Sequence, residues 1–231
     1  MHGRPPGPDG TPGAGPALLL VIGNRNYSSW SLRPWLALAM TGAAFETLRI
    51  PLSQPDTQAR IRQYSAAGKV PVLVDGGCTV WDSLAICEYL AERFPSARLW
   101  PADPAGRAQA RSVACEMHSG FTALRRELPM NIRLDRVGHA WSPEAQADID
   151  RVLALWSGLR ARHDAGGPFL FGRFSIADAM YAPVVLRLRS YRVPVPEDAA
   201  AYMRSVLDLP PMQEWIAAAV SEAERIESFE R

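Results

Sequence analysis

The stretch that decides the fold is NRNYSSWSLRPWL, residues 24–36. It follows a short apolar segment, residues 18–22, that predicts a strand, and it leads into helical periodicity over residues 32–40. Proline has no backbone N–H, so Pro34 predicts a helix capped no earlier than about Ser31. Ser28 and Ser29 are then expected in the loop, where they are either ordinary turn residues or hydroxyl donors to an electron-rich group such as a thiolate.

Length and charge fit a protein with real hydrophobic cores. The chain has 231 residues, is 48% hydrophobic and carries a formal charge of +1. Near-neutral charge disfavours a nucleic-acid surface, and no apolar run is long enough to cross a membrane.

The proline- and glycine-rich residues 1–16 predict a disordered tail without the apolar centre of a signal peptide, and we therefore expect a cytoplasmic protein. Three cysteines without metal spacing predict free thiols and no metal site.

The two halves of the chain differ in their predicted secondary structure. Up to residue 94 the pattern predicts strand, helix, strand, an uncertain helix, then a hairpin around Asp75-Gly76-Gly77 and a helix over residues 83–94. After a linker rich in proline and aspartate, the pattern predicts helices separated by proline and glycine, over residues 105–128, 143–163, 176–191, 197–207 and 212–227. We therefore expect a βαβ-ββα domain at residues 17–95, a linker at 96–104 and an all-helical domain at 105–231.

Two short motifs could bind the polar ends of an extended ligand. Pro71 begins a predicted strand, and one solution is a cis Val70–Pro71 bond that leaves the Val70 backbone open to a ligand. Asp82 and Ser83 open the next helix, where Ser83 can act as the cap. A helix start binds a carboxylate and Asp82 beside it can pair with an ammonium, which suits an α-amino-acid head group. Each motif taken alone also fits a plain turn or capping pair.

In combination these motifs resemble the glutathione transferase family. The resemblance rests on YSSWS at residues 27–31, KVP at 69–71, DSLAICEYL at 82–90 and FGRFSIAD at 171–178, where Ser175 and Asp178 form a capping box. It covers the chain from about residue 18 to its C-terminus. It implies a thioredoxin-like N-terminal domain followed by an all-helical domain, and a two-fold homodimer. The serine pattern is similar to zeta-class and bacterial omega-like members.

The resemblance also implies the residues of the site. Ser28, or failing that Ser29, would donate to the sulfur of glutathione, which is the co-substrate. Val70 would pair with the cysteinyl part, Ser83 with the γ-glutamyl carboxylate and Asp82 with its ammonium, and Lys69 could reach the glycyl carboxylate or face solvent. For the electrophile pocket the apolar candidates are Trp30, Met117, Phe121 and Trp141, although a place in the core explains each of them better. Arg133 could attract an anionic substrate or simply face solvent.

The expected activity is conjugation of glutathione to a small apolar electrophile, as in detoxification. A glutathione-dependent isomerase similar to maleylacetoacetate isomerase, a reductive dehalogenase and a non-catalytic binding module remain alternatives. Trp30 stands where zeta members have cysteine, which counts against omega-type thiol–disulfide exchange and against maleylacetoacetate isomerisation. The intact Ser28, Pro71, Asp82 and Ser83 disfavour a non-catalytic module.

Overall fold

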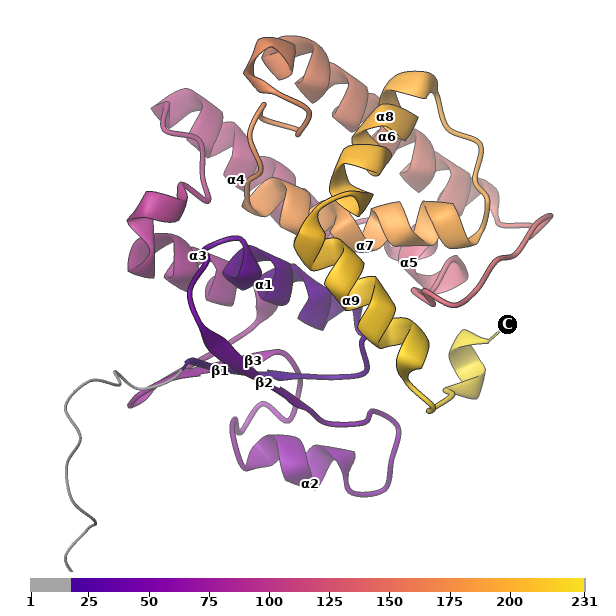
Figure 1. Cartoon of the computed structure of the whole chain (residues 1–231). Helices are drawn as coiled ribbons and strands as arrows, with labels where there is room; N and C mark the ends of the chain where they lie inside the picture. Colours follow the sequence, from indigo (N-terminus) through magenta and orange to yellow (C-terminus); the bar gives the residue numbers. More distant parts are fainter. Residues whose placement is uncertain (1–17, 231) are drawn as a thin grey trace, which may run out of the picture.

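The computed structural model describes residues 18–230, so the expected tail at residues 1–16 lies outside the described part. A sheet of four strands in the order β2-β1-β3-β4 forms the first half (Figure 1). The strands are β1 (Leu18–Ile22), β2 (Phe45–Arg49), β3 (Val72–Asp75) and β4 (Cys78–Trp81). β1 runs parallel to β2 and antiparallel to β3, and β3 and β4 form the predicted hairpin.

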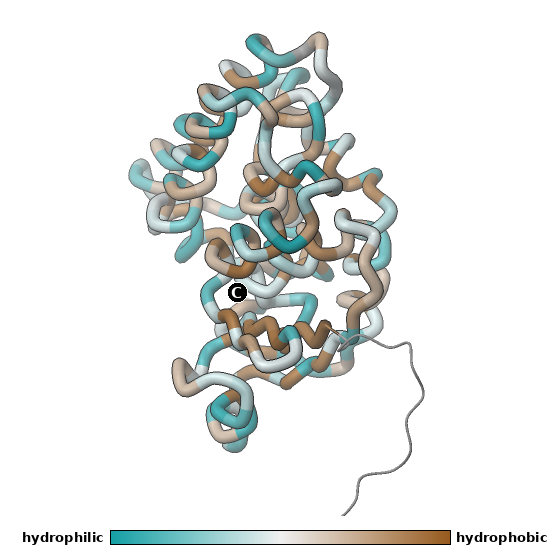
Figure 2. The backbone as a smooth tube through the Cα atoms, turned by 90° about the vertical axis from the view of Figure 1, so that its left-hand side faces the viewer, coloured by the Kyte–Doolittle hydropathy of each residue, from teal (hydrophilic) through white to brown (hydrophobic). Residues whose placement is uncertain are grey.

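Helices cover both faces of this sheet. α1 (Ser29–Ala39) and α3 (Ser83–Arg93) pack on one face, and α2 (Thr57–Arg62), the helix that the sequence left uncertain, lies on the other. Because both faces are covered, β1 is apolar at every position instead of alternating. Leu20 and Ile22 join the main core, whereas Val21 packs with Ile61 of α2. Figure 2 shows these strands as hydrophobic segments in the lower part of the molecule.

The second half is helical. Its helices are α4 (Pro104–Ser119), α5 (Thr122–Glu127), α6 (Pro143–His163), α7 (Ile176–Ser190), α8 (Glu197–Leu207) and α9 (Pro210–Ser221), with 3-10 turns at η1 (Pro95–Ala97), η2 (Asp164–Gly166) and η3 (Glu227–Phe229). α7 is almost fully buried and packs against α1 and α4, so it joins the two halves. None of the helices within residues 18–230 is long and apolar enough to cross a bilayer.

The predicted capping box at the start of α7 is confirmed. The Asp178 carboxylate is completely buried and accepts hydrogen bonds from the Ser175 backbone N–H at 2.8 Å and from the Ser175 hydroxyl at 3.1 Å. It also accepts from the Leu170 N–H at 3.0 Å and from the Tyr202 hydroxyl at 3.1 Å. α7 continues through Pro183.

Two helix predictions are wrong. A single helix over residues 105–128 is replaced by α4 and α5, because Gly120 ends α4 in an extended conformation and Phe121 turns the chain with a positive φ of 55°. A Cβ on Gly120 would lie 2.7 Å from the Glu116 carbonyl oxygen, so this turn needs glycine. The last helix ends at Ser221 rather than residue 227, because Glu222 is extended and hydrogen-bonds elsewhere.

Candidate active site

Ser28 caps α1, three residues earlier than predicted. Its Oγ accepts from the Ser31 backbone N–H at 3.4 Å, and its hydroxyl donates to Ser31 Oγ at 2.7 Å. The prediction of a cap at Ser31 is wrong because Pro34 lies inside the helix. Interior proline costs about 3 kcal/mol, so burial of α1 against α3 and α7 must outweigh the lost hydrogen bond. Ser29 is consequently the first helical residue and does not lie in the loop.

Two clefts meet beside the start of α1. The larger has a volume of about 660 Å³ and is lined by both candidate serines together with arginines from the helical half. The smaller, of about 310 Å³, lies between the turn before β3 and the start of α3. Three residues line both clefts: Trp30, Lys69 and Val70. A ligand of two parts could therefore occupy the small cleft and extend past Trp30 into the large one.

The small cleft contains the residues of the two motifs that were expected to bind the polar ends of glutathione, whereas Ser28 and Ser29 line the larger cleft. The small cleft is lined by Lys69, Val70, Pro71, Asp82 and Ser83, with Trp30, Ala67 and Trp81. The Val70–Pro71 bond is cis, as the sequence analysis proposed. The Val70 N–H and C=O form no hydrogen bond with another residue of the described range. They can therefore pair with an extended ligand.

Asp82, and not Ser83, caps α3. With a φ of 75°, Asp82 places Oδ1 at 2.9 Å from the Leu84 N–H and 3.2 Å from the Ala85 N–H. Ser83, predicted as the cap, is buried instead, and its Oγ has no hydrogen-bond partner among residues 18–230. A buried hydroxyl usually finds a partner, so this one fits a ligand atom in the cleft. His118 of α4 places Nε2 at 3.2 Å from Asp82 Oδ2, which brings the helical half to the same cleft.

Three arginines line the larger cleft, and one of them, Arg187, is buried. Arg187 of α7 donates to Ser29 Oγ at 3.2 Å and to the Arg125 carbonyl at 3.1 Å. Burial, together with repulsion from neighbouring Arg125, lowers the pKa of Arg187 to about 10 and that of Arg33 to about 9. Arg33 and Arg125 lie 4.2 Å and 5.1 Å from the Trp30 ring centroid. The site therefore favours anions, including a thiolate.

Comparisons with known proteins agree with this geometry. Models of the glutathione S-transferase N-terminal and C-terminal domains match residues 27–93 and 140–218. The chain is 38% identical over 200 residues to the maleylacetoacetate isomerase of Pseudomonas aeruginosa, a match that covers 80% of this chain and 87% of that protein. The chain belongs to the glutathione S-transferase family.

One further sequence relative and one solved structure resemble this chain. A probable maleylacetoacetate isomerase of Caenorhabditis elegans is 35% identical over 100 residues, which are 43% of this chain and 46% of that protein. A glutathione transferase homologue from Burkholderia, solved with bound glutathione, superposes with a TM-score of 0.69 at 24% identity, covering 89% of this chain and 100% of that one. At that identity the superposition shows the fold alone.

The electrophile-pocket candidates are dispersed in this transferase. Trp30 lines both clefts, whereas Met117 is part of the core and Phe121 is buried against Tyr181. Neither Met117 nor Phe121 lines a cleft described above. Arg133 lines neither cleft, and its guanidinium donates to Tyr27 and to the backbone near the C-terminus. Its guanidinium is therefore already hydrogen-bonded within the protein.

Several residues at the two clefts of this transferase were not predicted from the sequence. They are His118, Arg125, Arg126, Arg187 and, from the last turn of the chain, Phe229. The adjacent arginines 125 and 126 carried a visible charge signal, but nothing in their spacing tied them to the serines. Within residues 18–230 no three His, Cys, Asp or Glu side chains gather as a metal site would require.

Proposed function

We propose that this glutathione transferase binds glutathione in the small cleft and activates its thiol beside Ser28. The observation that carries the proposal is the small cleft itself, because residues from two separate motifs converge there around the unpartnered Ser83 hydroxyl. Ser83 would hold the γ-glutamyl carboxylate and Asp82 the ammonium. The Val70 backbone would pair with the cysteinyl unit, and Lys69 would face the glycyl carboxylate.

Thiol activation follows from the hydroxyls and charges at the start of α1. A free thiol has a pKa near 8.5, and lowering it by about two units requires roughly 2.7 kcal/mol of preference for the thiolate. If the Ser28–Ser31 hydrogen bond reverses, Ser31 donates to Ser28 and Ser28 is free to donate to sulfur. Ser29 adds a second hydroxyl, whose oxygen already accepts from Arg187. Buried arginine charge favours the thiolate further, so no formal base is required.

The electrophile would occupy the larger cleft. Its walls combine apolar surface from Trp30 and Phe229 with the cations Arg125, Arg126 and Arg187. This lining favours an electrophile that carries an anionic group beside its apolar part. It also favours, as a second candidate, glutathione-dependent cis–trans isomerisation of an unsaturated diacid, the activity for which the Pseudomonas relative is named. The thiolate would add to the double bond, permit rotation and leave again, so no enzyme cysteine is needed in place of Trp30.

Calorimetric titration with glutathione tests the proposal directly. We expect binding at or below cellular, millimolar glutathione, weakened about tenfold by Ser83→Ala, which removes one hydrogen bond to a charged group. Ser112→Ala, an exposed serine of α4 whose hydroxyl bonds only to its own helix, is the matched control and should leave affinity unchanged. Absence of binding in the wild type would refute the transferase mechanism. If glutathione binds, turnover of aryl halides against cis-diacids then separates conjugation from isomerisation.

Three broader expectations from the sequence belong to the same proposal. They are a two-fold homodimer, a cytoplasmic location with a role in detoxification, and the domain division at residues 17–95 and 105–231. Edge strand β4 exposes Trp81, 57% of whose surface is accessible, which supports a protein contact at this edge. Light scattering at micromolar concentration would measure the dimer.

A further inference from the structure

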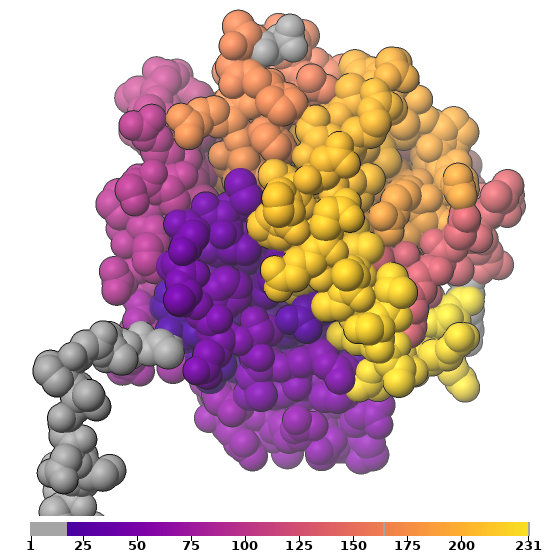
Figure 3. Space-filling view, viewed as in Figure 1, coloured from indigo at the N-terminus to yellow at the C-terminus, as the bar shows by residue number. Residues whose placement is uncertain are grey.

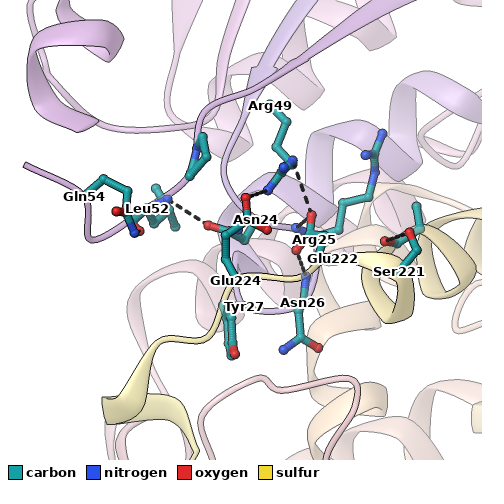
Figure 4. Close-up of polar contacts among 12 residues, drawn as sticks. Asn24, Arg25, Asn26, Tyr27, Arg49, Leu52, Gln54, Ser221, Glu222 and Glu224 are labelled. Atoms are coloured by element: carbon teal, nitrogen blue, oxygen red, sulfur yellow. Dashed lines mark hydrogen bonds and ion pairs between the residues drawn. The ribbon is translucent and has the colours of Figure 1, made fainter. Parts of the chain in front are cut away.

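The C-terminal residues 222–230, here called the strap, cross back over the loop that carries the serines. Glu222 begins the strap, and its buried carboxylate accepts the backbone N–H of Arg25 at 2.7 Å and of Asn26 at 3.2 Å (Figure 4). Arg49 of β2 pairs with Glu224 at 2.8 Å. In Figure 3 the C-terminal end lies directly against N-terminal residues. The strap is therefore fixed to the N-terminal half.

Tyr27, which precedes Ser28, connects the strap to the serine loop. Its hydroxyl accepts from Arg133 Nη2 at 2.7 Å and from the Ile226 N–H at 3.3 Å, and it donates to Glu230. Arg133 also donates to the Glu224 carbonyl at 2.8 Å. Tyr27 itself is 3% exposed, and its bond from the Ile226 N–H is buried, whereas the bonds to Arg133 and Glu230 are partly buried. The Tyr27 hydroxyl has two partners in the strap and a third, Arg133, that also bonds to the strap, so it holds the end of the chain in one position.

The held segment places an aromatic ring on the larger cleft. Phe229 lines that cleft together with Ser28 and Trp30. Its ring lies 5.4 Å from the Tyr27 ring, centroid to centroid, and its carbonyl accepts from Asn131 Nδ2 at 3.1 Å. Both anchors of Phe229 therefore belong to the network around Tyr27, which itself lines the larger cleft.

We propose that Phe229 is a specificity-determining wall of the electrophile pocket and that Tyr27, a positioning residue, sets where this wall stands. The wall would contact the apolar group attached to sulfur in a glutathione conjugate, whereas glutathione alone would not reach it. This inference rests on the proposed function, since it assumes that glutathione occupies the small cleft with its sulfur directed past Trp30.

Calorimetry with glutathione and with S-hexylglutathione tests the wall without requiring turnover. In the wild type we expect the hexyl chain to improve affinity. Phe229→Ala should reduce that improvement about tenfold, which is the loss expected when an aromatic contact disappears. Its affinity for glutathione itself should stay within about twofold of the wild-type value. Tyr27→Phe should reduce the improvement about threefold, because the ring remains but the hydroxyl hub is lost. Ser228→Ala, an exposed neighbour in the strap, is the matched control and should change neither affinity.

The two ligands separate the possible failures. An unchanged ratio of the two affinities in Phe229→Ala overturns the wall, whatever the glutathione affinity is. A parallel loss for both ligands also overturns it, because Phe229 would then support the fold in general. If the wild type binds neither ligand, the proposed function fails and the wall fails with it. A thermal melt of each variant identifies any loss caused by unfolding, and Phe229→Leu, which keeps apolar bulk, should then restore part of the ratio.

Discussion

Replacement of Ser28 by alanine should raise the pKa of enzyme-bound glutathione. In the structure Ser28 is 5% exposed and lines the larger cleft, and its hydroxyl is bonded to Ser31 Oγ at 2.7 Å. A hydrogen bond to a charged acceptor contributes roughly 1.5–3 kcal/mol, so its loss corresponds to about one to two pKa units for the bound thiol. Ser29, bonded to Arg187, and the buried arginines remain, so part of the activation persists.

Loss of the helix cap is a separate effect of the same substitution. Because Ser28 also caps α1, Ser28→Ala should lower the free energy of unfolding by about 1 kcal/mol. Ser31→Ala leaves the Ser28 hydroxyl in place and removes the hydroxyl that can donate to it, which also accepts the Gly23 N–H at 3.1 Å. It should therefore raise the thiol pKa by less than one unit. Ser29→Ala, which removes the hydroxyl next to Arg187, tests the second donor in the same way.

Thiolate absorbance near 240 nm, followed against pH with the enzyme saturated in glutathione, measures this pKa. The reasoning predicts the order wild type, Ser31→Ala, Ser28→Ala from lowest to highest thiol pKa. A Ser28→Ala variant that binds glutathione with a wild-type thiol pKa would refute the assignment of Ser28. If Ser29→Ala alone raised the pKa, the activating hydroxyl would be that of Ser29, polarised by Arg187.

Three other outcomes follow from particular contacts. Burial raises the pKa of Asp178 to about 6, so its contribution to stability is present below pH 4 and is lost as the pH rises through 6. Urea unfolding measures the free energy of unfolding of wild type and Asp178→Asn, and the difference between the two should change by up to about 2.7 kcal/mol between pH 4 and 7. Arg126→Gln, at the exposed rim of the larger cleft, should raise KM for an anionic electrophile about threefold at low salt and less at high salt, as steady-state assays at two ionic strengths would reveal. Glu222→Gln replaces one acceptor oxygen by an amide that cannot accept from Arg25 or Asn26 and should lower the unfolding free energy by about 1–3 kcal/mol; an unchanged urea midpoint would contradict that role.

The fold could be predicted because its signals are local. The strand and hairpin patterns, the capping box at Ser175 and Asp178, and the bounds of α6 and α8 all depend on residues close together in sequence. Predictions failed where tertiary contacts decide the outcome. Pro34 is tolerated inside α1 because that helix is packed on both sides, and the end of α9 depends on Glu222 reaching a loop nearly two hundred residues away. No local pattern contains either fact.

The candidate site divides along the same line. The small cleft, where we propose that glutathione binds, is lined by short motifs within the first half, so five of its residues could be named in advance: Lys69, Val70, Pro71, Asp82 and Ser83. The larger cleft, proposed for the electrophile, lies where α5, α7 and the strap meet the serine loop, and only the packing of the helical half brings Arg187 to Ser29. Arg133 illustrates the difference, since its charge was visible in the sequence but its partners, Tyr27 and the strap, were not.

The buried guanidinium groups of Arg33 and Arg187 favour the binding of an anion. Arg33 has Nε and Nη1 buried without a hydrogen-bond partner among the described residues, and neither Arg33 nor Arg187 forms an ion pair there. Burial and repulsion from Arg125 lower the pKa of both guanidinium groups, so their charge costs folding free energy. An anion placed between the serines and Arg187 would relieve that repulsion. The cost in the free enzyme thus becomes a preference for the thiolate over the thiol and for anionic over neutral electrophiles, which is why both properties should weaken together when Arg187 is replaced.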